Sequence, residues 1–211
     1  MKILVVGASQ GTGALTVQAA LDKGHEVTAF ARTPSRLAIE NPRLAKVTGD
    51  FHQRDSVDAA VQGHGAVIVT ASSTSLKGFR EKPTYFSLGT GYVIEAMKKH
   101  GVRRLVVLSA LGTGETRPLV PALVRAILVG WILKSAYADH ERQEKMVRES
   151  GLDWVVARPG RLTNGPARRQ YVKTAAIEKV PSSISRADVA DFLVTAAETD
   201  TWVQHSVQLG G

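Results

Sequence analysis

Three glycines near the start of the chain form the pattern with the clearest chemical meaning. Gly7, Gly11 and Gly13 follow an apolar run over residues 3–6 and open an alanine- and leucine-rich stretch that extends to about Lys23. The run predicts a buried parallel strand, and the stretch predicts a helix. Glycines at such a turn let a pyrophosphate approach the backbone at the helix N-terminus. The pattern therefore predicts a dinucleotide site.

A second strand is expected over residues 25–31, and the residues after it indicate which dinucleotide binds. An NAD site places an Asp or Glu about 20 residues beyond the glycines, where it binds the ribose hydroxyls. This chain instead has Arg32, followed by Ser35 and Arg36. Two guanidinium groups and a hydroxyl suit a 2′-phosphate, so NADP(H) is preferred over NAD. The alternative is a pair of solvated arginines on a surface loop.

The composition limits the class of protein. The length of 211 residues suits one α/β domain over residues 1–211 with modest additions. The absence of cysteine excludes disulfides and cysteine nucleophiles, and the six histidines lack the spacing of a metal site. The net charge of +8 suits an anionic ligand, but no basic run is interleaved with aromatics, so no nucleic-acid partner is expected. The first strand begins at the N-terminus, which favours a cytoplasmic enzyme without a membrane span.

Further strand patterns alternate with helix-like segments, as is typical of a doubly wound, mostly parallel sheet of the Rossmann type with a small C-terminal addition. The expected strands cover residues 46–48, 66–70, 104–109, 154–157 and 206–209. A short helix is expected over residues 55–61, ended by Gly63. Ligands bind beyond the carboxyl ends of such strands. The residues at these ends include Asp50, Phe51, Ala71, Ser72, Ser109, Pro159 and Arg161.

Two of these ends and two longer segments carry further expectations. Asp50 could accept a hydrogen bond from an adenine amino group while Phe51 packs on the ring, although Asp50 could also cap a following turn. The polar residues 71–89 predict a mobile loop near the nicotinamide. Residues 118–133 are apolar nearly all round but contain Arg125 and are too short for a membrane span. A core helix, a lid over an apolar pocket and an oligomer face all stay open for them.

The chain resembles the atypical short-chain dehydrogenase/reductase family, and within it the NADPH-dependent flavin reductase/biliverdin-IXβ reductase type and its NmrA-like relatives. The resembling stretches are residues 27–37, 96–102, 147–154 and 186–190. The resemblance implies that NADP(H) is held by Gly7, Ser9, Gln10, Gly11 and Thr12 at the pyrophosphate, by Arg32, Ser35 and Arg36 at the 2′-phosphate, by Asp50 and Phe51 at the adenine, and by Ala71, Ser72, Leu108 and Leu162 near the nicotinamide. Gly13 and Pro159 complete the set of candidate cofactor residues.

The catalytic residues depart from the common pattern. Most short-chain dehydrogenases use Tyr-x-x-x-Lys, in which the lysine lowers the tyrosine pKa so that the tyrosine can protonate an alkoxide. None of the four tyrosines here has a lysine four residues later. Where that lysine would lie, the chain has Asp139 and His140, which resemble the Asp-His pair of the flavin reductase type. The serine of that type falls on Ala110, with Ser109 adjacent.

Ser109 and His140 are therefore candidates for proton handling. After the sixth strand the flavin reductase type has a second histidine, whereas this chain has Arg161 two residues beyond Pro159. Arg161 could stabilise a reduced anion or bind a substrate carboxylate; the alternative is a salt-bridged arginine on the rim.

The missing tyrosine motif bears on the substrate. A ketone needs a positioned proton donor, whereas a conjugated ring spreads the arriving charge and can be protonated by solvent. We therefore expect an NADPH-dependent reductase of a small conjugated acceptor such as a flavin, quinone or tetrapyrrole. The alternative is an NmrA-like module that binds NADP(H) without turnover and reports to a protein partner. A nucleotide-sugar epimerase would need the absent tyrosine motif and a larger C-terminal region.

Overall fold

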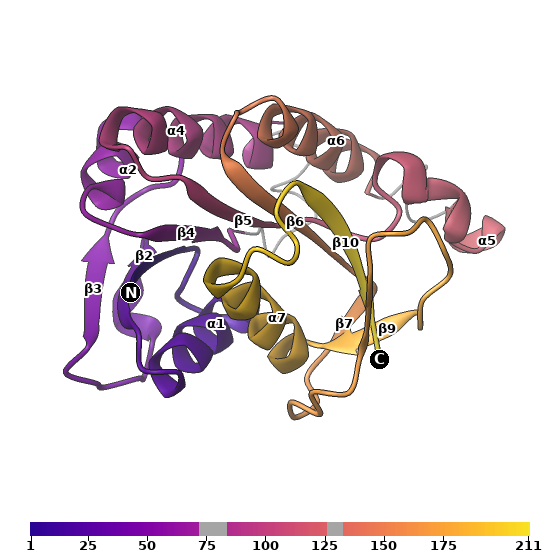
Figure 1. Ribbon diagram of the computed structural model, residues 1–211, viewed down its shortest axis with the longest axis horizontal. Helices are drawn as coiled ribbons and strands as arrows, with labels where there is room; N and C mark the ends of the chain where they lie inside the picture. The colour runs from indigo at the N-terminus through magenta and orange to yellow at the C-terminus, as the bar shows by residue number, and fades with distance from the viewer. Residues whose placement is uncertain (72–83, 126–132) are drawn as a thin grey trace.

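The computed structural model describes residues 1–71, 84–125 and 133–211, and an eight-stranded sheet forms its centre (Figure 1). The strands are β1 (Lys2–Val6), β2 (Glu26–Ala31), β3 (Leu44–Thr48), β4 (Ala66–Val69), β5 (Arg104–Leu108), β6 (Asp153–Pro159), β8 (Val172–Thr174) and β10 (His205–Gly210). They lie in the order β3-β2-β1-β4-β5-β6-β10-β8, and only the β10–β8 pair is antiparallel. The expected doubly wound, mostly parallel Rossmann-like fold is therefore confirmed.

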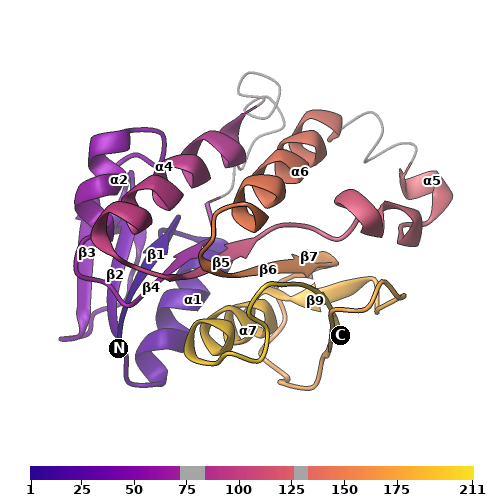
Figure 2. The same ribbon diagram turned by 45° about the horizontal axis from the view of Figure 1, so that its top comes forward.

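Helices cover both faces of the sheet (Figure 2). Helices α1 (Gly11–Asp22) and α7 (Arg186–Glu198) pack together on one face, and α2 (Arg54–Val61), α4 (Tyr85–His100) and α6 (Lys134–Arg148) lie on the other. Because strand side chains alternate between faces, β1 sends Ile3 and Val5 into the α1–α7 core and Leu4 and Val6 into the opposite core. Burial on both sides explains why β1 is a continuous apolar run.

Shorter elements outside the main sheet connect its strands, and two of them, β7 (Arg161–Thr163) and β9 (Ser183–Ser185), form the small C-terminal addition. The other short elements of the described chain are η1 (Pro34–Arg36), η2 (Gly114–Leu119) and α5 (Ala122–Val124). Strands β7 and β9 pair in parallel as a separate sheet. Helix α7 follows β9 directly because Ser185 is its N-cap, accepting a hydrogen bond at 2.9 Å from the backbone N–H of Asp188.

Helix α4 begins inside the segment that the sequence predicts as a loop. Of residues 71–89, those from Tyr85 onward are helical, and residues 72–83 lie outside the described residues. The cause is a long-range contact: the Asp139 carboxylate on α6 accepts hydrogen bonds from the Phe86 N–H at 2.6 Å and the Ser87 hydroxyl at 2.5 Å. These groups stand in the first turn of α4, where backbone N–H groups lack partners within the helix. Asp139 therefore acts as a cap supplied by a neighbouring helix.

The apolar segment 118–133 is not a core helix where the structure describes it. Its first part ends η2 and forms the three-residue α5, in which the Leu123 side chain is 73% exposed. Residues 126–132 lie outside the described residues, so the lid and the oligomer face stay predictions. Among the helices of the described ranges, none is long and apolar enough to span a bilayer.

Candidate functional site

A cleft of about 910 Å³ opens at the carboxyl ends of the central strands. It lies beside β1, where the strand order reverses, which is the position at which open parallel sheets bind ligands. The cleft is lined by most of the residues that the sequence predicts for a site. These are Gly7, Ser9, Gln10, Gly11, Thr12, Gly13, Arg32, Arg36, Asp50, Phe51, Ala71, Leu108, Ser109, His140 and Leu162.

The glycine loop between β1 and α1 requires glycine at two positions for close packing. Gly7 has a φ of +86°, and a Cβ on it would lie 2.6 Å from the backbone of Ala71. A Cβ on Gly13 would lie 2.2 Å from the carbonyl oxygen of Gly7. Gly11 differs, because the nearest atom to its Cβ position is Arg186 Nε, at 3.9 Å. The backbone at Gly11 is therefore open to the cleft.

The N-terminus of α1 fits an anionic group. The helix begins at Gly11, Gln10 makes no capping hydrogen bond with its side chain, and no acidic side chain lies in the first turn. The first backbone N–H groups of the helix thus have no intrahelical acceptor, and the helix dipole favours a negative charge there. These properties fit a dinucleotide pyrophosphate.

Arg32 and Arg36 lie at the end of the cleft that follows β2. Both are exposed and line the cleft. With the residues that the structure describes, neither guanidinium group forms a hydrogen bond or an ion pair, so both can bind a ligand. Ser35, between them on η1, is exposed but does not line the cleft.

Asp50 and Phe51 follow β3 and are held by protein contacts. Asp50 Oδ1 accepts a hydrogen bond from the His52 N–H at 2.9 Å, so the turn-capping alternative is confirmed for this oxygen. The Phe51 ring is only 6% exposed, because it packs against α4 at Gly89, where a Cβ would lie 2.4 Å from the ring. Phe51 thus belongs mainly to the core, and its contact with an adenine stays a prediction.

His140 on α6 lines the opposite part of the cleft. Its ring stacks on Phe86 with a centroid separation of 3.9 Å, and its Nδ1 lies 2.9 Å from Gln143 Oε1. Burial lowers the pKa of His140, outweighing the contact with Gln143, which raises it. The imidazole is therefore neutral at pH 7.

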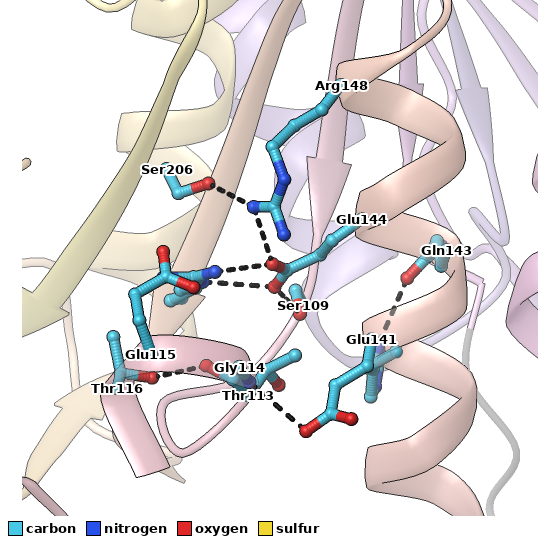
Figure 3. A network of polar contacts seen from close by, with 12 residues as sticks. Ser109, Thr113, Gly114, Glu115, Thr116, Glu141, Gln143, Glu144, Arg148 and Ser206 are labelled. Carbon is cyan, nitrogen blue, oxygen red and sulfur yellow. Dashed lines mark hydrogen bonds and ion pairs between the residues drawn. The ribbon is translucent and has the colours of Figure 1, made fainter. Parts of the chain in front are cut away.

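Ser109 is joined to a buried network of charged side chains (Figure 3). Its hydroxyl donates to Glu144 Oε1 at 2.6 Å. Arg158, which is 1% exposed, donates to both Glu144 oxygens, from Nε at 3.0 Å and Nη2 at 2.5 Å, and to Glu115 at 2.8 Å. Arg148 adds a contact with Glu144 at 3.1 Å. Removing one partner of a buried ion pair costs about 3–5 kcal/mol of folding stability, so the charged side chains of Glu144 and Arg158 each require the other in order to stay buried.

Four predicted residues do not line the cleft or cannot be placed in it. Arg161 is an exposed residue of β7 outside the cleft lining, because side chains alternate along a strand and its neighbour Leu162 is the one that lines the cleft. Pro159 is buried as the last residue of β6, and its carbonyl accepts a hydrogen bond from Leu111. Ser35 is the third, and Ser72 lies outside the described residues.

Several cleft residues were missed by the sequence patterns. Arg186, at the start of α7, faces the glycine loop and donates to Asn164 Oδ1 at 2.6 Å. Tyr137 also lines the cleft and donates from its hydroxyl to the Leu111 carbonyl at 3.2 Å. Arg186 lies in the resembling stretch 186–190, but that resemblance assigns it no role in the site, and no motif marks Tyr137 as a site residue. Among the described residues, no cluster of His, Cys, Asp or Glu could hold a metal ion.

The chain matches known proteins along most of its length. Over 207 residues it is 28% identical to an uncharacterized chloroplast protein of Arabidopsis thaliana, covering 92% of this chain and 71% of that protein. The fold superposes on the anaerobillin reductase ChuY of Escherichia coli O157:H7 with a TM-score of 0.81, at 24% identity, covering 100% of this chain and 97% of that one.

A second solved structure, a wide-type short-chain dehydrogenase/reductase of Veillonella parvula in complex with NADP, has a TM-score of 0.80 at 19% identity, covering 100% of this chain and 94% of that one. At these identities the two structures establish the fold. The NAD(P)H-binding family matches residues 7–200. The chain therefore belongs to the NAD(P)H-binding family of Rossmann-like proteins.

Proposed function

We propose that this protein is an NADPH-dependent reductase that transfers hydride to a conjugated acceptor such as a flavin, quinone or tetrapyrrole. The main observation in support of this proposal is the set of residues that line the cleft. The lining includes two arginines that can bind a phosphate and several aromatic side chains, and the sequence has no Tyr-x-x-x-Lys motif.

The cofactor residues follow from the family and from the shape of the cleft. When bound, NADPH supplies a hydride from its nicotinamide ring. The open backbone at Gly11 and the N-terminus of α1 would hold the pyrophosphate, with Arg186 facing it. Arg32 and Arg36 would hold the 2′-phosphate in a bidentate manner that suits guanidinium groups. Asp50 Oδ2, which has no hydrogen bond among the described residues, remains for the adenine amino group.

The state of Tyr137 argues against a ketone substrate. Its hydroxyl donates to the carbonyl of Leu111, and burial raises its pKa. The residue four positions later is Glu141, not a lysine that would lower the pKa. Tyr137 is therefore a poor proton donor at pH 7.

A conjugated acceptor removes the need for such a donor. One hydride arrives on the acceptor, its negative charge spreads over the ring system, and one proton follows from water. The work of the protein is then to hold two planar rings together and to exclude water, with Phe86 and Leu162 among the apolar walls. The names of two structural relatives, an anaerobillin reductase and a dehydrogenase crystallised with NADP, support this direction.

The test is anaerobic oxidation of NADPH by the purified protein with a panel of flavins, quinones and bilins. We expect steady turnover with at least one acceptor and a much slower reaction with NADH. Tight NADPH binding without turnover of any acceptor would refute the enzyme and favour the NmrA-like sensing module. Turnover with simple ketones only would refute the conjugated-acceptor class.

A further inference from the structure

Ser109 cannot donate a hydrogen bond to a ligand in the cleft. Its hydroxyl proton is directed to Glu144, which also receives Arg158 and Arg148. A carboxylate paired with two guanidinium groups accepts hydrogen bonds only, so the serine must be the donor in that contact. A hydroxyl has one proton and two lone pairs, and only the lone pairs remain for the cleft that Ser109 lines.

An independent set of contacts leaves His140, like Ser109, with a hydrogen-bond acceptor rather than a donor for a ligand. The side-chain amide nitrogen of Gln143 donates to Thr90 Oγ1 at 2.8 Å, so its Oε1 is left to accept from His140 Nδ1 at 2.9 Å. Gln143 and Thr90 are both buried, and stacking on Phe86 fixes the imidazole plane. This arrangement puts the proton on Nδ1 and leaves a lone pair on Nε2.

The second nitrogen of His140 is available to a ligand. Nε2 has no hydrogen-bond partner among the described residues, and the residue lines the cleft. Because burial lowers the pKa of His140, Nε2 carries no proton at pH 7. Two side chains from different elements, β5–η2 and α6, therefore offer acceptors in the same cleft.

We propose that the substrate presents N–H or O–H donors to Ser109 and His140, so that the preferred acceptors are N–H-bearing conjugated heterocycles rather than quinones, whose oxygens only accept. This inference rests on the proposed reductase function and narrows its substrate class. When an acceptor atom of a ligand faces one of these protein acceptors, neither atom gains a hydrogen bond. Such a ligand therefore binds less tightly. Ser109 and His140 are then substrate-orienting residues, and the proton for the product comes from water.

Matched ligands test the inference by binding alone. With the protein saturated with NADP⁺, we would titrate lumiflavin, which has an N3–H donor, its 3-methyl analogue, which lacks it, and menadione. We expect lumiflavin to bind about threefold to tenfold more tightly than the analogue, the value of one neutral hydrogen bond. Equal affinities of the two flavins, or tighter binding of menadione, would overturn the inference.

Variants separate the hydrogen bond from steric effects of the methyl group. Ser109→Ala removes one acceptor, and His140→Phe removes the other while keeping a ring to stack on Phe86. The preference for lumiflavin over its 3-methyl analogue should vanish in at least one of these two variants. If it persisted in both, the inference would be overturned. Thr113→Val is the matched control, since the buried Thr113 hydroxyl has no hydrogen-bond partner in the described part of the chain and does not line the cleft.

A measurement on the unmodified protein covers the case in which a variant fails to fold. Proton–nitrogen correlation spectra at pH 7 should show His140 as the neutral tautomer protonated on Nδ1. An Nε2-protonated ring or an imidazolium would overturn the inference. NADPH oxidation is followed on the same samples: a flavin preference without turnover refutes the proposed reductase alone, and turnover without the preference refutes only this inference.

Discussion

Cofactor selectivity should depend on Arg32 and Arg36, and its size follows from their surroundings. A hydrogen bond to a charged group contributes about 1.5–3 kcal/mol, and solvent screening reduces it at an exposed site to about 1–1.5 kcal/mol. Both guanidinium groups are exposed and have no hydrogen-bond or ion-pair partner in the described ranges. The double variant Arg32→Ala/Arg36→Ala should therefore lose about 2–3 kcal/mol of NADPH binding, or roughly 30- to 150-fold in Kd.

The assay is calorimetric titration of each protein with NADPH and with NADH. NADH lacks the 2′-phosphate, so its affinity should change by less than about threefold, within the cost of a lost surface charge. Arg54→Ala is the matched control: it removes an exposed arginine that pairs with Glu95 and does not line the cleft. Equal losses for NADPH and NADH would refute the 2′-phosphate assignment.

Three further predictions concern the elements that hold the site. Asp139→Ala should lower the free energy of unfolding by about 2 kcal/mol in urea titrations, because the first turn of α4 loses its cap; an unchanged midpoint would contradict this. Gly89→Val should cost at least about 1–3 kcal/mol, since a Cβ would lie 2.4 Å from the Phe51 ring, and wild-type thermal stability would exclude that packing. The hydrogen bond from Arg158 lowers the pKa of Glu115 below its ordinary 4.5, so Glu115 stabilises the fold above that pH and the contribution disappears on acidification. Glu115→Gln should reduce the slope of the free energy of unfolding against pH below pH 4.5, and a slope equal to that of the wild type would refute this role of Glu115.

The central strands and the glycine loop were predictable because their signals are local. Continuous apolar runs such as residues 3–6 predict strands buried on both faces, and all the strands so predicted are present. Gly7 and Gly13 had to be glycine for reasons of close approach, and this is the property that the motif encodes. The short strands β7, β8 and β9 were not predicted, because three residues carry no measurable periodicity.

The features that the sequence patterns miss depend on contacts between distant residues. The start of α4 depends on Asp139, which is more than fifty positions away in the sequence. Because this contact is not local, the sequence predicts a loop that extends to Gly89, inside the helix. The burial of Phe51 likewise depends on a distant residue, Gly89, and its contact with an adenine stays a prediction. Pairing with β9 makes residues 161–163 a strand, and side-chain alternation along it puts Leu162 at the cleft and Arg161 outside the lining.

A single-turnover isotope measurement can test whether bound NADPH transfers a hydride to a conjugated acceptor. Protein loaded with NADPH, or with NADPH deuterated at the transferred position, is mixed with a flavin, a quinone or a bilin, and loss of nicotinamide absorbance is followed. We expect oxidation by at least one acceptor, faster than in free solution and slower with the deuterated cofactor. Bound NADPH that is oxidised by none of them above the uncatalysed rate would contradict this expectation.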